Sequence, residues 1–164
     1  MKRFVGIVLL YAGLALLAGQ SASAKENVAL LYTSGVPQAQ FAGAEIRLAL
    51  EARGNGCLGG TLDDLAKASG NVRIVLAASA AEAKRLTADL GLAPLKASAA
   101  QSYALRKKAD GGRTTYAVLA TDPTGAMYGG LDVAEAVRLG TLADLKDSDH
   151  APHIERRGIK FNIP

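Results

Sequence analysis

Short apolar runs alternate with longer segments of periodic apolar and polar residues along most of the chain. The short runs end at glycine or polar residues, which is typical of buried strands. The longer segments repeat apolar side chains every three or four residues, which is typical of helices packed on a sheet. This pattern predicts strands at residues 27–33 and 72–77, helices at 38–53 and 80–90, and a short helix at 61–68 that opens on a capping-box sequence.

A glycine-rich turn separates the next two predicted strands. Residues 102–107 and 114–120 are both rich in strand-forming side chains, and Asp110-Gly111-Gly112 lies between them. Two such runs around a short glycine turn favour a β-hairpin.

The last predicted helix begins at a strong start signal. Asp122 followed by Pro123 is typical of a helix N-terminus, and the helix is expected to run to about Leu139. The element order is then β-α-(α)-β-α-β-β-α. We predict an α+β fold, a two-layer α/β sandwich whose mixed sheet carries its helices on one face. Residues 25–140 would form this domain, and the polar residues 141–155 a linker.

The first residues have the composition of a secretory signal. Lys2 and Arg3 precede an apolar run over residues 4–18, and an Ala-x-Ala pattern then ends at Ala24. A membrane-spanning helix needs about 20 apolar residues, so we interpret residues 1–24 as a cleaved signal peptide instead of an anchor. The residue directly after the cleavage site is Lys25 and not a cysteine, so a lipoprotein is not indicated, and no later run is long enough to span a membrane. We expect an exported protein, periplasmic or secreted, without membrane contact after cleavage.

The charge and cysteine content exclude two broad classes. Removing residues 1–24 lowers the formal net charge from +4 to +2 and leaves 140 of the 164 residues, enough for one domain. A charge this small, with scattered basic residues, argues against a nucleic-acid partner. Cys57 is the only cysteine, so no internal disulfide can form and packing must hold the fold.

One glycine-rich segment matches a nucleotide-binding motif in letters only. Gly54-Asn55-Gly56-Cys57-Leu58-Gly59 fits the pattern G-x-G-x-x-G. That motif works directly after a strand, where the backbone can reach a pyrophosphate at a helix N-terminus. Here it follows a predicted helix, so we interpret it as a helix C-cap and loop, and we predict no cofactor.

Neither the histidines nor the acidic pairs make a convincing reactive site. His150 and His153 would supply at most half of a metal site, and the polar segment around them favours solvated side chains. Cys57 has no obvious histidine partner for a nucleophilic role. The acidic pairs do not suggest the two facing carboxylates of a glycosidase, because Asp63-Asp64 opens a helix and Glu45 and Glu51 lie on one. We therefore predict no catalytic residue and no metal site in this chain.

The segment after the hairpin carries a family resemblance. Residues 121–131, with the pattern Asp-x-x-Gly-Ala-x-Tyr-Gly from Asp122 to Gly129, resemble the end of the non-catalytic N-terminal domain of certain glycoside hydrolases. These are the family 20 β-hexosaminidases and the family 67-like α-glucuronidases. In them this helix leads through a linker into Arg-Gly and apolar residues, the first strand of a (β/α)₈ barrel, and residues 156–164 resemble that strand.

The resemblance implies an accessory role. Residues 25–140 would pack against and support the catalytic barrel of the same parent chain. Two arrangements agree with this role: the domain only supports the barrel, or it also lends a wall to the sugar cleft. The carbohydrate is a partner only through the parent chain. The family's catalytic carboxylates lie on later barrel strands, so none can be assigned here and this chain alone is expected to be inactive, as a fragment or a truncated gene product. The alternative is a free-standing periplasmic binding or interaction module without enzymatic activity.

Export gives a first testable prediction. If residues 1–24 are a signal peptide, the secreted protein begins at Lys25, which mass spectrometry of the N-terminal peptide will detect. An intact Met1 on secreted material would contradict this interpretation.

Overall fold

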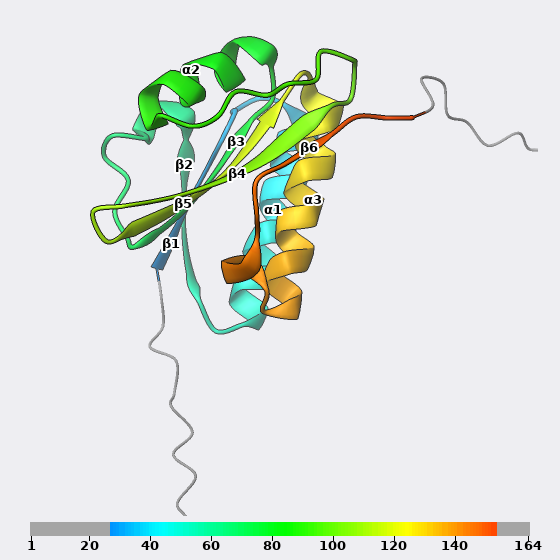
Figure 1. Ribbon diagram of the computed structural model, residues 1–164. Helices are drawn as coiled ribbons and strands as arrows, with labels where there is room; N and C mark the ends of the chain where they lie inside the picture. Colours follow the sequence, from blue (N-terminus) through cyan, green and yellow to red (C-terminus); the bar gives the residue numbers. More distant parts are fainter. Residues whose placement is uncertain (1–26, 154–164) are drawn as a thin grey trace, which may run out of the picture.

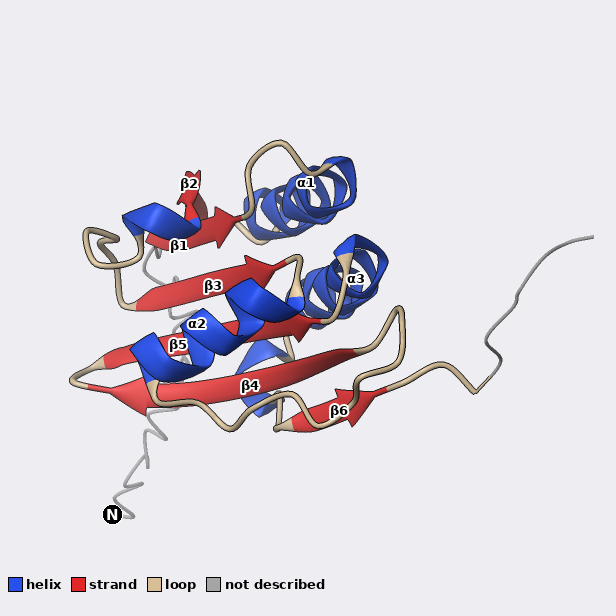
Figure 2. Cartoon of the chain, turned by 90° about the horizontal axis from the view of Figure 1, so that it is seen from above, coloured by secondary structure: helices blue, strands red, loops and turns tan. Residues whose placement is uncertain are grey.

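A six-stranded mixed sheet lies at the centre of the computed structural model, which describes residues 27–153 (Figure 1). Its strands are β1 (Asn27–Tyr32), β2 (Gly56–Thr61), β3 (Val72–Ala77), β4 (Tyr103–Asp110), β5 (Arg113–Ala120) and β6 (Ser148–His150). The strand order across the sheet is β2-β1-β3-β5-β4-β6, which Figure 2 shows with β2 at one edge and β6 at the other. Neighbouring strands from β2 to β5 are parallel, and β4 is antiparallel to both β5 and β6.

Helices cover both faces of this sheet (Figure 1). They are α1 (Pro37–Ala52), α2 (Ala80–Leu90) and α3 (Pro123–Leu139), with 3₁₀ turns η1 (Leu62–Asp64) and η2 (Leu142–Asp144). Ile74 and Leu76 of β3 pack towards α1 and α3, whereas Val75 and Ala77 pack towards α2. The α+β fold with a mixed sheet is confirmed. The expectation that all helices share one face is wrong for α2, because the parallel strands are apolar on both faces and each face needs cover.

The elements with strong local signals form as predicted. The hairpin turns at Gly111 and Gly112, whose φ angles of 56° and 80° fit a type I′ turn. The Asp122 side chain accepts a hydrogen bond from the Gly125 backbone N–H at 2.9 Å and so caps α3. Gly140 ends that helix in the left-handed region.

The glycine-rich segment after α1 is a strand, not the predicted loop. Residues 56–61 form β2, which pairs in parallel with β1 from Asn27 to Tyr32. Strands pair through their backbone groups, so β2 can form although its sequence GCLGGT has a single large apolar side chain. Such a run has no apolar periodicity that would predict a strand. The capping box after it is present, because Asp64 Oδ2 accepts hydrogen bonds at 2.9 Å from the backbone N–H and the hydroxyl of Thr61. The helix that it opens is only the three-residue turn η1.

The expected linker contributes the sixth strand of the sheet. β6 pairs with the first residues of β4, and the buried Arg106 guanidinium holds it there. This side chain is 2% exposed and donates to the carbonyl oxygen of Ser148 at 2.7 Å and to both carboxylate oxygens of Asp149 at 2.9 and 3.0 Å. It also donates to the carbonyl oxygens of Ala93 and Pro94. A polar segment therefore joins the sheet through the hydrogen bonds of one buried guanidinium. The pattern of apolar residues along the chain cannot predict such a contact.

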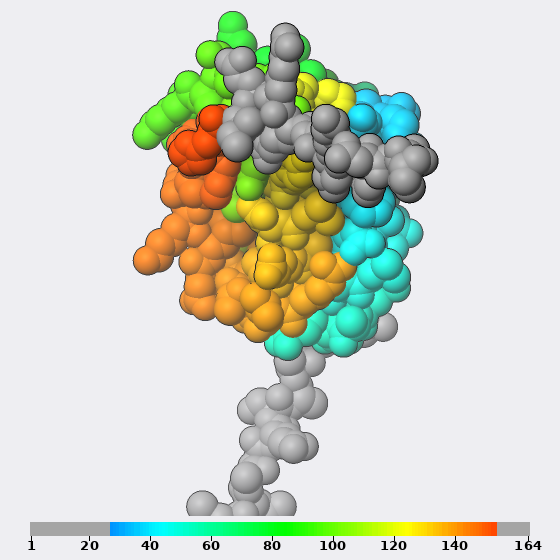
Figure 3. Space-filling view, turned by 90° about the vertical axis from the view of Figure 1, so that its right-hand side faces the viewer, coloured from blue at the N-terminus to red at the C-terminus, as the bar shows by residue number. Residues whose placement is uncertain are grey.

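Helices α1 and α3 lie side by side on one face of the molecule (Figure 3). Their contact is built from small residues, and a Cβ atom added to Gly130 would lie 2.6 Å from Ala42 Cβ and 2.9 Å from Leu76 Cδ2. Such distances leave no room for a side chain. Gly130 therefore sets how closely α3 approaches both α1 and the sheet.

Two predicted segments, the signal peptide at 1–24 and the strand at 156–164 that would begin the barrel, lie outside the described residues. Within residues 27–153, no helix is long and apolar enough to cross a membrane.

The helix contact gives a second prediction. Gly130→Ala should lower the free energy of unfolding by about 1–2 kcal/mol, because overpacking outweighs the gain of about 1 kcal/mol in helix propensity. Glu135→Ala on the exposed side of α3 is the control, since it places a methyl group on the same helix away from any buried contact. We expect that variant to stay within about 0.5 kcal/mol of the original protein in denaturant unfolding. A Gly130→Ala variant as stable as the original protein would contradict the assigned role of Gly130.

Candidate functional site

A pocket of about 480 Å³ opens where β4 begins, β6 ends and the first half of α3 passes. It lies at the edge of the sheet formed by β6, within the segment that the sequence analysis expects to be a linker. Its lining combines aromatic rings with a carboxylate and amide and imidazole groups, from Gln101, Tyr103, Tyr128, Leu131, Asp132, His150, Ala151, Pro152 and His153. This mixture can bind a partner that offers both apolar surface and hydrogen-bonding groups.

Tyr103 is the residue that organises this pocket. Its ring stacks on the His150 ring with centroids 4.6 Å apart and planes 6° apart. Its hydroxyl donates a short hydrogen bond to Asp132 Oδ2. Behind it, a Cβ atom on Gly129 would lie 2.7 Å from Tyr103 Cδ2, so the ring can pack against α3 only because residue 129 has no side chain.

The electrostatics of the pocket keep the Tyr103 hydroxyl protonated. Burial raises the pKa of Tyr103 well above its ordinary value, and the hydrogen bond to Asp132 and the charge of that carboxylate raise it further. The hydroxyl therefore serves as a hydrogen-bond donor, not as a base. On the other side, His150 Nε2 lies 2.9 Å from Ser148 Oγ and shares a hydrogen bond with it, which helps to fix the imidazole ring.

The acidic residues considered from the sequence are spread over both faces of the sheet. Glu45 forms an ion pair with Arg138 between α1 and α3. Asp63 forms an ion pair with Arg85 of α2 at 3.0 Å, and Asp64 caps the turn η1. The structure does not bring any of these carboxylates beside Asp132. Glu45, Asp63 and Asp64 each have a structural partner, and Glu51 is exposed on α1.

The candidate metal and nucleophile residues also lie apart. Within residues 27–153, no group of three or more His, Cys, Asp or Glu side chains is placed to hold a metal ion. Cys57 is in β2, at the edge of the sheet opposite β6 and the histidines. Burial raises the pKa of its thiol, although the charge of the nearby Arg47 counteracts this, and a raised pKa disfavours the reactive thiolate.

Sequence reasoning missed this pocket for a physical reason. Tyr128 belonged to the recognised pattern, but Tyr103, Asp132 and His150 come from three distant segments. His150 meets Tyr103 because β6 pairs beside β4, and no pattern in the sequence indicates that pairing.

Comparisons with known proteins assign no family to this chain. No family model matches it, and no curated protein matches it. Among solved structures it is similar to a GH138 enzyme targeting pectin rhamnogalacturonan II, with a TM-score of 0.47 and 18% sequence identity. The match covers 77% of this chain and 15% of that enzyme, so the chain spans a small fraction of the enzyme's length.

The Tyr103 hydroxyl gives a third prediction, on pH dependence. The folded state holds this proton more tightly than the unfolded state, whose tyrosine ionises near pH 10. Its contribution to stability is therefore complete below about pH 10 and is lost as the pH rises above that value. Tyr103→Phe should reduce the alkaline decline in the denaturant midpoint between about pH 9 and 11. Asp132→Asn should reduce it in part, because burial still acts on the hydroxyl.

The matched control for this measurement is Tyr128→Phe, which removes a hydroxyl from the same pocket but no hydrogen bond to Asp132. Parallel alkaline declines in the original protein and in Tyr103→Phe would show that this hydroxyl does not contribute as described.

Proposed function

We propose that residues 27–150 are the non-catalytic accessory domain of an exported glycoside hydrolase, which supports a catalytic barrel in the same parent chain. The observation that carries this proposal is the role of the residues behind the family resemblance. They form the first turns of α3 and the contact of α3 with the sheet.

Four of the five named positions of the Asp-x-x-Gly-Ala-x-Tyr-Gly pattern have a packing reason, and the fifth, Tyr128, lines the Tyr103 pocket. Asp122 caps the helix, and a Cβ atom on Gly125 would lie 2.4 Å from the Ser102 carbonyl oxygen. Ala126 is fully buried, and Gly129 makes room for Tyr103. These residues hold the fold together, and none of these contacts indicates a catalytic role. This supports the non-catalytic role that the resemblance implies.

The carboxylates that line the Tyr103 pocket and the cavity between α2, η1 and the β4–β5 hairpin do not form a glycosidase pair. Hydrolysis of a glycosidic bond needs a protonated carboxyl group and an ionised carboxylate on either side of one bond. Asp132 is the only described carboxylate in the Tyr103 pocket, and one of its oxygens already accepts the Tyr103 hydroxyl. In the cavity beside α2, Asp63 and Asp110 pair with Arg85 and Lys108 and are largely exposed. Asp89, the third carboxylate there, is exposed as well.

We propose the Tyr103 pocket as the surface that contacts the barrel. Residues 151–153 line it directly after β6, so a domain joined beyond this point would begin beside the pocket. The stacked Tyr103 and His150 rings offer apolar surface, and Asp132 offers an acceptor for a partner's cation. The carbohydrate would reach the barrel and not this domain.

A fourth prediction tests the absence of catalysis. The purified mature chain should hydrolyse aryl-glycosides no faster than buffer, measured by release of the chromogenic phenol. The control is the same assay on Asp132→Asn, which should give the same background rate. Turnover by the original chain that disappears in any single Asp or Glu variant would overturn the proposal and leave an enzyme in its own right.

A further inference from the structure

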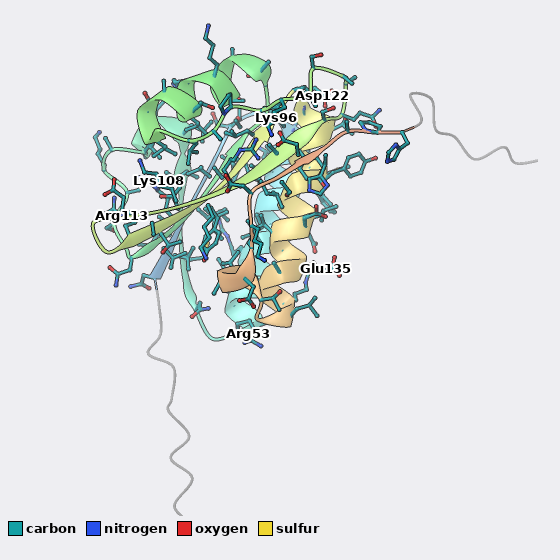
Figure 4. All side chains as sticks on the ribbon, viewed as in Figure 1. Arg53, Lys96, Lys108, Arg113, Asp122 and Glu135 are labelled. Atoms are coloured by element: carbon teal, nitrogen blue, oxygen red, sulfur yellow. The ribbon has the colours of Figure 1, made fainter. Side chains whose placement is uncertain are left out.

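A second cavity, of about 850 Å³, lies on the face of the sheet that α2 covers. It opens between α2, the turn η1 and the β4–β5 hairpin, away from the Tyr103 pocket, and no function has been given to it above. Figure 4 shows Lys108 and Arg113 at this hairpin end of the molecule, far from Asp122 at the start of α3. Four cationic side chains line the cavity together with three acidic ones: Arg73, Arg85, Lys108, Arg113, Asp63, Asp89 and Asp110.

Two of the four cations are neutralised within the cavity. Arg85 pairs with Asp63 at 3.0 Å, and Lys108 Nζ lies 3.9 Å from Asp110 while it donates to the Leu90 carbonyl oxygen. Arg73 and Arg113 are different. Within residues 27–153, no carboxylate oxygen lies within 4 Å of either guanidinium. The cavity thus holds two neighbouring positive charges without a partner of opposite sign.

Arg73 is a buried cation that only neutral groups solvate. It is 9% exposed, and its Nε and Nη2 donate to Thr115 Oγ1 at 3.2 and 3.0 Å, while Nη1 donates to the Leu65 carbonyl oxygen at 3.0 Å. Burial lowers the pKa of Arg73, and the charge of Arg113 lowers it further. Burying a charge without a counter-charge is unfavourable, so a bound anion would stabilise this arrangement.

Arg113 is held in an orientation that leaves its fork open. Its Nε donates to the Gly70 carbonyl oxygen at 3.0 Å, which fixes the guanidinium plane. The terminal nitrogens Nη1 and Nη2 have no hydrogen-bond partner among the described residues. A planar guanidinium with free terminal N–H groups fits the two oxygens of a carboxylate or phosphate.

We propose that this cavity binds a small organic anion, whose oxyanion group pairs with Arg113 and with the remaining N–H groups of Arg73. The cavity volume is in the range of small-molecule sites, larger than an isolated oxyanion requires. The exposed Asp89 carboxylate on α2 also lines the cavity, and it forms no ion pair within residues 27–153. This inference is independent of the accessory-domain role, since it concerns a different face and different residues.

Calorimetric titration of the mature chain with inorganic phosphate and, separately, with citrate tests the proposal at constant ionic strength set by sodium chloride. We expect saturable 1:1 binding of at least one probe, which tells phosphate from carboxylate recognition, with a Kd below about 10 mM. Arg113→Gln should weaken binding by about tenfold or more, the value of a charge-assisted bidentate contact. Asp89→Asn should tighten binding about two- to fivefold, because it removes one nearby negative charge.

The matched control is Lys84→Gln, which removes one positive charge from the exposed side of α2 outside this cavity. It should leave binding within about twofold of the original value, the effect of a screened distant charge. If Arg113→Gln does not fold, as judged by circular dichroism, Arg113→Lys keeps the charge, lacks the fork, and should still weaken binding. Absence of binding by both probes, or equal losses in Lys84→Gln and the Arg113 variant, would overturn the proposal.

Discussion

The close approach of α3 to the sheet and to α1 is the constraint on which the rest of the structure depends. Three glycines allow it, at positions where a Cβ atom would lie within 2.6 Å of a carbonyl oxygen or a buried carbon: Gly125, Gly129 and Gly130. Because interiors are close-packed, a methyl group at any of them would move the helix outward. The position of α3 in turn places Asp132 beside Tyr103, so the candidate site follows from the same packing.

A single buried cation completes that site from the other side. Arg106 connects β4 to residues 93–94 and to β6, and its donors are satisfied by carbonyl oxygens and by Asp149. Burial would raise the pKa of Asp149, but hydrogen bonds from the Lys96 backbone and from Arg106 outweigh it and lower the pKa. Without this network β6 would lose its anchor, and His150 would not stack on Tyr103.

The sequence predicts the parts of the fold whose signals are local. Strands β1 and β3, the hairpin and the capped helix α3 are carried by apolar runs, a glycine turn and the Asp122-Pro123 start, and all are found in place. Strands β2 and β6 pair at the two edges through backbone groups and through Arg106, so their own side chains carry no periodic pattern. The Tyr103 pocket and the arginine cavity depend on contacts between distant segments and could not be predicted either.

The size of the native polypeptide that carries residues 27–150 tests the accessory-domain role most directly. An antibody raised against these residues should detect, in the exported fraction of the native cells, a polypeptide heavier than 16.9 kDa by roughly 27 kDa or more, the mass of a barrel of about 250 residues. That polypeptide, once captured, should hydrolyse glycosides. Detection only of a species no heavier than 16.9 kDa, with no glycosidase activity attached, would contradict the role and favour a free-standing binding module.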